Sequence, residues 1–180
     1  MSPWSVFALR GFFSQMQETQ QAIDERWMRR ALELARSAAS QGEVPVGAVV
    51  VSDDGVELAA AANAVETLKD ATAHAEVLAL QAASRAYGDW RLEHCTLYVT
   101  KEPCAMCAGA TVNCRVGALV FGVSDPRMGA AGSALSITDF PGMLHRVPVR
   151  AGVCADECRQ VLQEFFRARR NAVESDSSCR

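Results

Sequence analysis

The sequence predicts an α/β fold in which helices cover both faces of a mixed five-stranded sheet. Residues 43–51 are apolar almost throughout, as expected of a strand that is buried on both faces. Residues 95–100 alternate between apolar and polar side chains, whereas the segments before and after them repeat their apolar residues at helical spacing. Because strand-like and helix-like segments alternate along the chain, the helices are expected to pack on the two faces of one sheet.

Turn and cap signals separate the expected elements. Asp24 is a plausible N-cap of the first helix, and Gly42 ends that helix. The turn sequence Asp53-Asp54-Gly55 joins the next two strands into a hairpin. In chain order, the sequence predicts a helix from Asp24, strands at 43–51 and 56–63, a loop at 63–70, a helix at 73–86, a strand at 95–100, a helix at 104–114, strands at 116–123 and 147–149, and a helix at 155–172.

The chain of 180 residues is most simply one domain with short extensions. We expect residues 1–22 to form a poorly ordered N-terminal extension, residues 23–172 the folded domain and residues 173–180 a flexible tail. The extension is partly apolar but lacks the basic start of a secretory signal peptide. A polar segment follows it, so Met16 is an alternative start of the natural chain.

The charge, the apolar runs and the cysteines of the chain argue against several classes of protein. The net charge of −3 does not favour nucleic-acid binding by the whole surface, so any RNA must be bound by a local basic patch. No apolar run approaches the roughly 18 residues of a membrane span. Seven cysteines without a secretory signal favour reduced, metal-binding thiols in a cytoplasmic protein over a disulfide framework.

The strongest chemical signal is Pro103-Cys104-x-x-Cys107 at the start of a predicted helix. Two thiols three residues apart are close enough to share a metal ion, and a helix N-terminus favours the thiolate that binds zinc. His74, at the start of another predicted helix, provides a third ligand, which leaves one position of a tetrahedral zinc open for water. A closed structural zinc site or a redox Cys-x-x-Cys pair is the alternative, whereas Cys95, Cys114 and Cys158 are expected in the core.

Glu76 follows His74 by two residues, so the two side chains point in different directions from a helix. The carboxylate is therefore expected beside zinc-activated water, where it moves protons without binding the metal. Addition of hydroxide to a C=N carbon and loss of ammonia require such a proton shuttle. His-x-Glu followed by Pro-Cys-x-x-Cys is the signature of zinc-dependent nucleobase deaminases.

Beyond these motifs, the chain resembles bacterial tRNA-specific adenosine deaminases from about Trp27 to Arg170. The resemblance is carried by several segments, among them Gly42-Glu43-Val44-Pro45-Val46-Gly47-Ala48, Thr72-Ala73-His74-Ala75-Glu76, Glu102-Pro103-Cys104-Ala105-Met106-Cys107-Ala108-Gly109-Ala110, Gly129-Ala130-Ala131-Gly132-Ser133 and Phe165-Phe166-Arg167. It implies a three-layer α/β/α fold of the cytidine-deaminase type. It also implies a homodimer that converts adenosine to inosine at the wobble position of a tRNA anticodon, expected to be an arginine tRNA.

The resemblance also implies roles for individual residues. One zinc ion per subunit is expected on the three ligands above, with Glu76 as the proton shuttle. Asn63 matches an asparagine that holds the base, Val44 an apolar wall of the base pocket, and Asp125 a contact to the backbone or ribose near the target. From the residues alone, Asn63 and Asp125 would be interpreted as ordinary turn residues.

Phe166, Arg167, Arg169 and Arg170 end the last predicted helix with an aromatic ring and three cations, which is typical of RNA contacts. Alternatively, the arginines only balance the partial negative charge of a helix C-terminus, and Phe166 packs in the core. Lys101 departs from the family, whose members usually carry an apolar residue there.

Three other functions are compatible with the zinc motif. They are a deaminase of a free base or nucleoside such as guanine or cytosine, a non-catalytic RNA-binding zinc module, and an inactive partner subunit. Glu76 argues against the last two, because a structural site has no use for a carboxylate beside the metal.

Overall fold

The computed structural model describes residues 18–177 and contains one five-stranded sheet. The strands are β1 (Gly47–Ser52), β2 (Glu57–Ala62), β3 (Cys95–Lys101), β4 (Ala118–Val123) and β5 (Val149–Ala151). Their order across the sheet is β2-β1-β3-β4-β5, with β1 antiparallel to β2 and β3, and with β3, β4 and β5 mutually parallel. The predicted mixed sheet is therefore confirmed.

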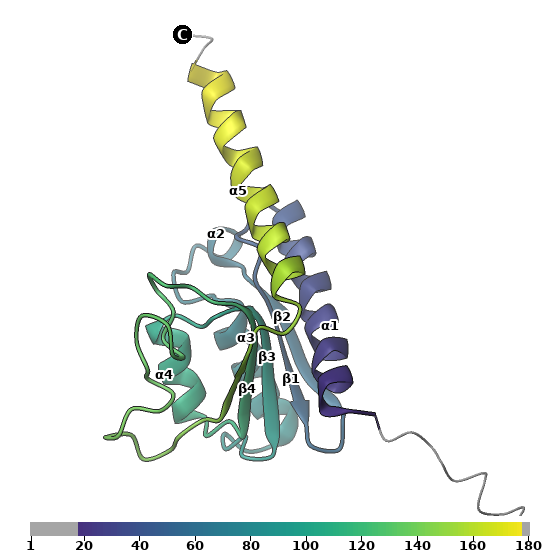
Figure 1. Cartoon of the computed structure of the whole chain (residues 1–180), viewed down its shortest axis with the longest axis vertical. Coiled ribbons are helices and arrows are strands. Elements are labelled where there is room, and N and C mark those ends of the chain that lie inside the picture. Colours follow the sequence, from purple (N-terminus) through teal and green to yellow (C-terminus); the bar gives the residue numbers. More distant parts are fainter. Residues whose placement is uncertain (1–17, 178–180) are drawn as a thin grey trace, which may run out of the picture.

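Helices cover both faces of this sheet, as Figure 1 shows. The helices are α1 (Gln20–Ser40), α2 (Val65–Leu68), α3 (Ala75–Tyr87), α4 (Ala105–Asn113) and α5 (Ala155–Ser177). Helices α1 and α5 lie side by side on one face, and α3 and α4 cover the other (Figure 1). The C-terminal half of α5 projects beyond the sheet (Figure 1).

Strand alternation decides which helix each side chain meets. Along β1, Val49 and Val51 pack in a cluster with Met28 of α1 and Cys158 of α5. The intervening Ala48 and Val50 pack instead in a cluster with apolar residues of α3. A central strand that is apolar on both faces therefore holds two cores together, which explains the nearly continuous apolar run in the sequence. The three-layer α/β/α prediction is confirmed.

The expected start of the first helix was wrong. The helix begins at Gln20, and its N-cap is Thr19, whose hydroxyl accepts a hydrogen bond from the amide of Ala22 at 3.2 Å. Asp24 lies one turn inside the helix, is buried, and forms an ion pair with Arg150 of β5 at 2.7 Å. Its sequence position suggested a cap because short acidic residues are common there, whereas its partner is remote in sequence.

Other element bounds also differ from the predictions. The first strand begins at Gly47 because residues 43–46 bend into a loop, and the loop at 63–70 contains the short helix α2. The fifth strand is Val149–Ala151, and α5 continues to Ser177. Residues 1–17, including Met16, and residues 178–180 lie outside the described part of the chain. Within the described part, no helix has the length and apolar character needed to cross a bilayer.

Candidate active site

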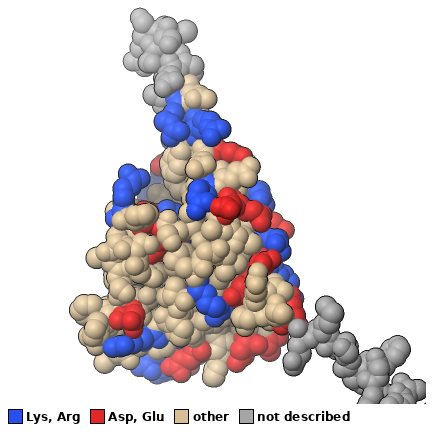
Figure 2. Space-filling model, viewed as in Figure 1, with Lys and Arg blue, Asp and Glu red and all other residues tan. Residues whose placement is uncertain are grey.

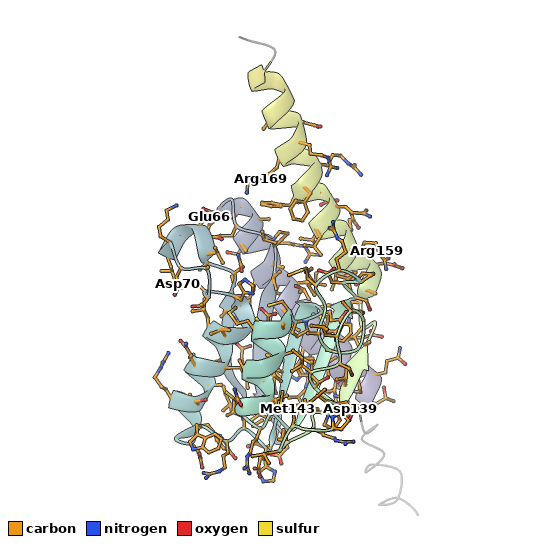
Figure 3. The ribbon with its side chains drawn as sticks, turned by 90° about the vertical axis from the view of Figure 1, so that its left-hand side faces the viewer. Glu66, Asp70, Asp139, Met143, Arg159 and Arg169 are labelled. Atoms are coloured by element: carbon orange, nitrogen blue, oxygen red, sulfur yellow. The ribbon has the colours of Figure 1, made fainter. Side chains whose placement is uncertain are left out.

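A cavity of about 310 Å³ opens where α3 and α4 begin, next to α2 and α5. Glu66 of α2 and Arg169 of α5, both at its mouth, are labelled above the sheet in Figure 3. The lining residues are Glu43, Val44, Val46, Asn63, Val65, Glu66, His74, Glu76, Lys101, Glu102, Cys104 and Arg169. The cavity therefore brings together segments that are separated by more than a hundred residues.

His74, Cys104 and Cys107 meet at one side of this cavity. His74 is the N-cap of α3, Cys104 is the N-cap of α4, and Cys107 lies in the first turn of α4. The Nδ1 atom of His74 lies 3.4 Å from the sulfur of Cys107 and 3.7 Å from that of Cys104, and the two sulfurs are 3.7 Å apart. In a tetrahedral zinc site, ligand atoms lie about 3.5–3.8 Å from one another. The three ligand atoms thus fit zinc.

The two thiols have different protonation behaviour. The hydrogen bond shared with Cys107, together with the amides at the helix start, lowers the pKa of Cys104 to about 5. The same sulfur–sulfur hydrogen bond and burial raise the pKa of Cys107. The thiolate form is therefore favoured at Cys104, and a thiolate is the form that binds a divalent metal.

Glu76 lies in the first turn of α3 and is only 4 % exposed. It lines the same cavity as His74. Burial raises the pKa of its carboxyl group, because a charged carboxylate is poorly solvated there. Burial thus favours the protonated form of this carboxyl group, which lies near the three candidate metal ligands.

Glu43 is a buried carboxylate in the cavity lining to which the sequence analysis gave no role. It is buried, and its carboxylate accepts hydrogen bonds from the Asn63 amide group and from the backbone amides of Glu66 and Thr67, at 2.6–3.1 Å. Burial alone would raise the pKa of Glu43, but these donors outweigh it and hold the pKa below its usual value. Glu43 therefore fixes Asn63 and the start of α2 against the cavity. The only sequence signal was an acidic residue in an apolar segment.

Glu102 also lines the cavity and fixes another loop in the same way. Its buried carboxylate accepts hydrogen bonds from the backbone amides of Asp125, Ala131 and Ser133 at 2.9–3.1 Å, and from the Ser133 hydroxyl. Burial opposes ionisation of Glu102, yet these donors lower its pKa below the usual value. Glu102 thus holds the loop at 125–133 beside the cavity.

The expected RNA-contacting residues lie at three places. Val44 and Asn63 line the cavity. Asp125 is outside the lining set and forms an ion pair with Lys101, which does line the cavity.

The arginines in the C-terminal half of α5 line two different cavities. Arg169 lines the cavity with Glu76, and its guanidinium lies 5.7 Å from the centre of the Phe165 ring. Phe166, Arg167 and Arg170, which were also predicted to contact RNA, line a second cavity of about 600 Å³ together with two further arginines. That second cavity is lined by Arg127, Arg159, Leu162, Gln163, Phe166, Arg167 and Arg170. Figure 2 shows basic side chains gathered around α5 where it leaves the body of the molecule.

The chain is similar to known deaminases. Residues 23–170 match the MafB19-like deaminase family. A protein named tRNA-specific adenosine deaminase from Haemophilus influenzae is 47% identical over 148 residues, which are 82% of this chain and 86% of the relative. A protein of the same name from Bacillus subtilis is 45% identical, over 80% of this chain and 89% of the relative.

A solved structure also resembles the whole domain. It comes from a study of A-to-I editing by tRNA:A34 deaminases at the wobble position of transfer RNA. The two chains superpose with a TM-score of 0.73 at 40% identity, over 76% of this chain and 99% of the other.

Proposed function

The chain belongs to the family of bacterial tRNA-specific adenosine deaminases, and we propose on this basis that it hydrolyses the wobble adenosine of a tRNA anticodon to inosine with the help of zinc. The observation that carries the proposal is a triangle of ligand atoms with zinc spacing beside a buried carboxyl group, in a cavity of about 310 Å³. The proposed deaminase domain spans residues 23–172.

His74, Cys104 and Cys107 would hold the zinc ion, one per chain, through one nitrogen and two sulfur atoms. When bound, zinc lowers the pKa of a coordinated water from about 15.7 to about 7. Zinc binds the thiolate form of cysteine, so its binding is coupled to deprotonation of the cysteine pair, which the lowered pKa of Cys104 favours.

Glu76 would move the protons of the reaction. Hydrolysis of adenosine consumes one water molecule and releases ammonia, so the C6–N bond breaks and a C6–O bond forms. The carboxylate takes one proton from the attacking water and donates it to the ring nitrogen. It then takes the second proton from the new hydroxyl group on C6 and donates it to the departing amine, which leaves as ammonia. Burial, which favours the protonated form of Glu76, supports this role.

Asn63 and Val44 would hold the base. Glu43 accepts a hydrogen bond from the Asn63 amide nitrogen at 3.1 Å, so that the carbonyl oxygen of the same side chain is held in one orientation. A fixed polar group in a narrow cavity discriminates strongly between bases, because a mismatched base leaves it unpaired. Val44, which is 36% exposed, offers an apolar wall.

Residues 166–170, in the C-terminal half of α5, would bind the anticodon loop. A base enters a cavity of this kind only after it has left its stack, which is easiest in a single-stranded loop. Arg169 lies at the mouth of the catalytic cavity, whereas Phe166, Arg167 and Arg170 border the second cavity. The nucleotides on either side of the target adenosine would thus contact these arginines and the exposed ring of Phe166. The cytoplasm is the proposed location, since tRNA is the proposed substrate.

Inosine formation in an arginine-tRNA anticodon stem-loop with a wobble adenosine tests this proposal. Free adenosine, guanine and cytosine are run beside it under the same conditions. We expect inosine in the RNA and no ammonia from the free compounds. Ammonia from a free base with an unchanged stem-loop would overturn the tRNA assignment and retain a deaminase of free bases.

A homodimer is the proposed assembly. Apolar side chains are exposed on α4 and the loop after β4, among them Met106, Phe140 and Leu144, of which Leu144 is 99% exposed. Figure 2 shows few charged side chains over much of this face. Sedimentation of the full chain should give twice the monomer mass, and a monomeric species at micromolar concentration would contradict the proposal.

A further inference from the structure

Lys101, the residue that departs from the family pattern, is the last residue of β3 and lies at the mouth of the catalytic cavity. Its ammonium group forms an ion pair with Asp125 at 2.5 Å. The side chains are 30% and 15% exposed, respectively, so solvent screens this pair less than a fully exposed one. The contact fixes a side chain that would otherwise rotate freely at a strand end.

Asp125 is itself held by its surroundings. Its second carboxylate oxygen accepts hydrogen bonds from the backbone amides of Arg127 and Met128 at 3.0 and 3.3 Å, and its own amide donates to Glu102. Burial would raise the pKa of Asp125, but the hydrogen bond from Lys101 and these amides hold it below its usual value. Asp125 is therefore a rigid, ionised anchor for the ammonium group.

Acidic side chains outnumber basic ones around the cavity, so a cation at this place favours an anionic substrate. Among the described residues that line the cavity, four are glutamates, of which Glu43 and Glu102 have lowered pKa values. The permanent cations in the same set are Lys101 and Arg169. The two cations offset part of the repulsion between these carboxylates and an approaching RNA backbone.

The ammonium group has hydrogen atoms left for a ligand. Lysine carries three N–H donors, and the described part of the chain engages one of them, through Asp125. A phosphate oxygen accepts such donors strongly, because both partners are charged.

We propose that Lys101, positioned by Asp125, binds a backbone phosphate next to the target adenosine, and so acts in substrate binding and not in the chemical step. The inference rests on the proposed function, since it requires an RNA substrate. Asp125 then acts on the RNA through Lys101.

Steady-state kinetics on the stem-loop test the role of Lys101. Lys101→Met, which keeps the length of the side chain without its charge, should raise KM about fivefold with kcat changed less than twofold. The slope of log KM against log salt concentration should fall by about 0.7, the value for one phosphate contact on a single strand. Lys101→Arg should restore most of the KM and the slope.

Arg91→Met is the matched control. It also removes one positive charge, but Arg91 lies beyond the C-terminal end of α3, about 20 Å along the helix from His74. Its KM and salt slope should equal those of the unmodified chain. An equal effect of both substitutions would show that net charge alone matters, and an unchanged KM and slope for Lys101→Met would overturn the inference.

A double-mutant cycle with Asp125→Asn tests the anchor. If Asp125 acts through Lys101, its substitution should change KM little once Lys101 has become methionine. Fully additive effects would contradict the anchor. If the unmodified chain forms no inosine in the stem-loop, the proposed function is wrong. If it forms inosine but the Lys101 predictions fail, only the inference about Lys101 is wrong.

Discussion

Three carboxyl groups are buried around the same cavity, and their neighbours shift their pKa values in different directions. Glu43 and Glu102, in the two walls, each accept several hydrogen bonds, and their pKa values lie below the usual range. Glu76, at the metal-binding side, is as deeply buried, but there burial prevails and its pKa is raised. The number of donors around a carboxylate thus separates a group that fixes a loop from one that can carry a proton.

The largest effect should come from loss of a metal ligand. Cys107→Ser should reduce bound zinc from about one ion per chain to a small fraction, and inosine formation by at least about 10³-fold, because serine is a poor zinc ligand at neutral pH. Metal analysis and single-turnover assays measure both. Cys114→Ser is the control, because Cys114 caps the other end of α4 and should leave zinc and turnover intact. Full activity in metal-free Cys107→Ser would exclude the zinc mechanism.

Glu43→Gln tests whether a wall carboxylate acts only by fixing structure. The glutamine amide would face a backbone N–H donor and leave it unpaired, so we expect a loss of about 1–2 kcal/mol in the free energy of unfolding. Because Asn63 is held by the same carboxylate, KM should rise about tenfold while zinc content stays the same. Denaturant titration and steady-state kinetics give the two values. Loss of zinc from Glu43→Gln would contradict this expectation, because it would show that Glu43 also supports the metal site.

The pH dependence of the free energy of unfolding should show that Glu43 is ionised in the folded chain. The folded-state pKa of Glu43 lies below its usual value of 4.5, so the ionised carboxylate stabilises the fold above pH 4.5. This contribution is lost as the pH falls through the lower, folded-state pKa. The difference in unfolding free energy between the unmodified chain and Glu43→Gln should therefore be constant near neutrality and shrink in acid. A difference that grows as the pH falls would have the wrong sign.

Asp24 should affect stability alone, because its polar cluster lies far from the catalytic cavity. Its carboxylate accepts hydrogen bonds from Gln20, Tyr98 and Arg150 at 2.7–2.9 Å. Asp24→Asn should lower the free energy of unfolding by about 2 kcal/mol, since it leaves donors unpaired. The kcat/KM for the stem-loop should be unchanged. A selective loss of turnover without loss of stability would link this face of the sheet to catalysis.

These residues also show what the sequence could predict. His74, Cys104 and Cys107 follow from local patterns, because each lies at or near the start of a helix whose period is visible in the sequence. Glu43 and Glu102 could not be assigned, since their partners are mostly backbone amides more than 20 residues away, and an amide has no residue-type signature.

Asp24 was misassigned for a related reason. Its partner Arg150 is 126 residues away, on a strand of only three residues. The division of the α5 arginines between two cavities likewise depends on how the helix packs, which sequence spacing does not determine.

Glu76→Gln provides the most direct test of the central claim, that the buried carboxyl group beside the metal site carries the protons. Zinc content, thermal stability and single-turnover inosine formation are measured on the same preparation, with the exposed Glu33→Gln as the control. The account predicts about one zinc ion per chain, a stability at least equal to that of the unmodified chain, and a rate lower by about 10²–10⁴-fold. A zinc-loaded variant that forms inosine at a near-normal rate would contradict it.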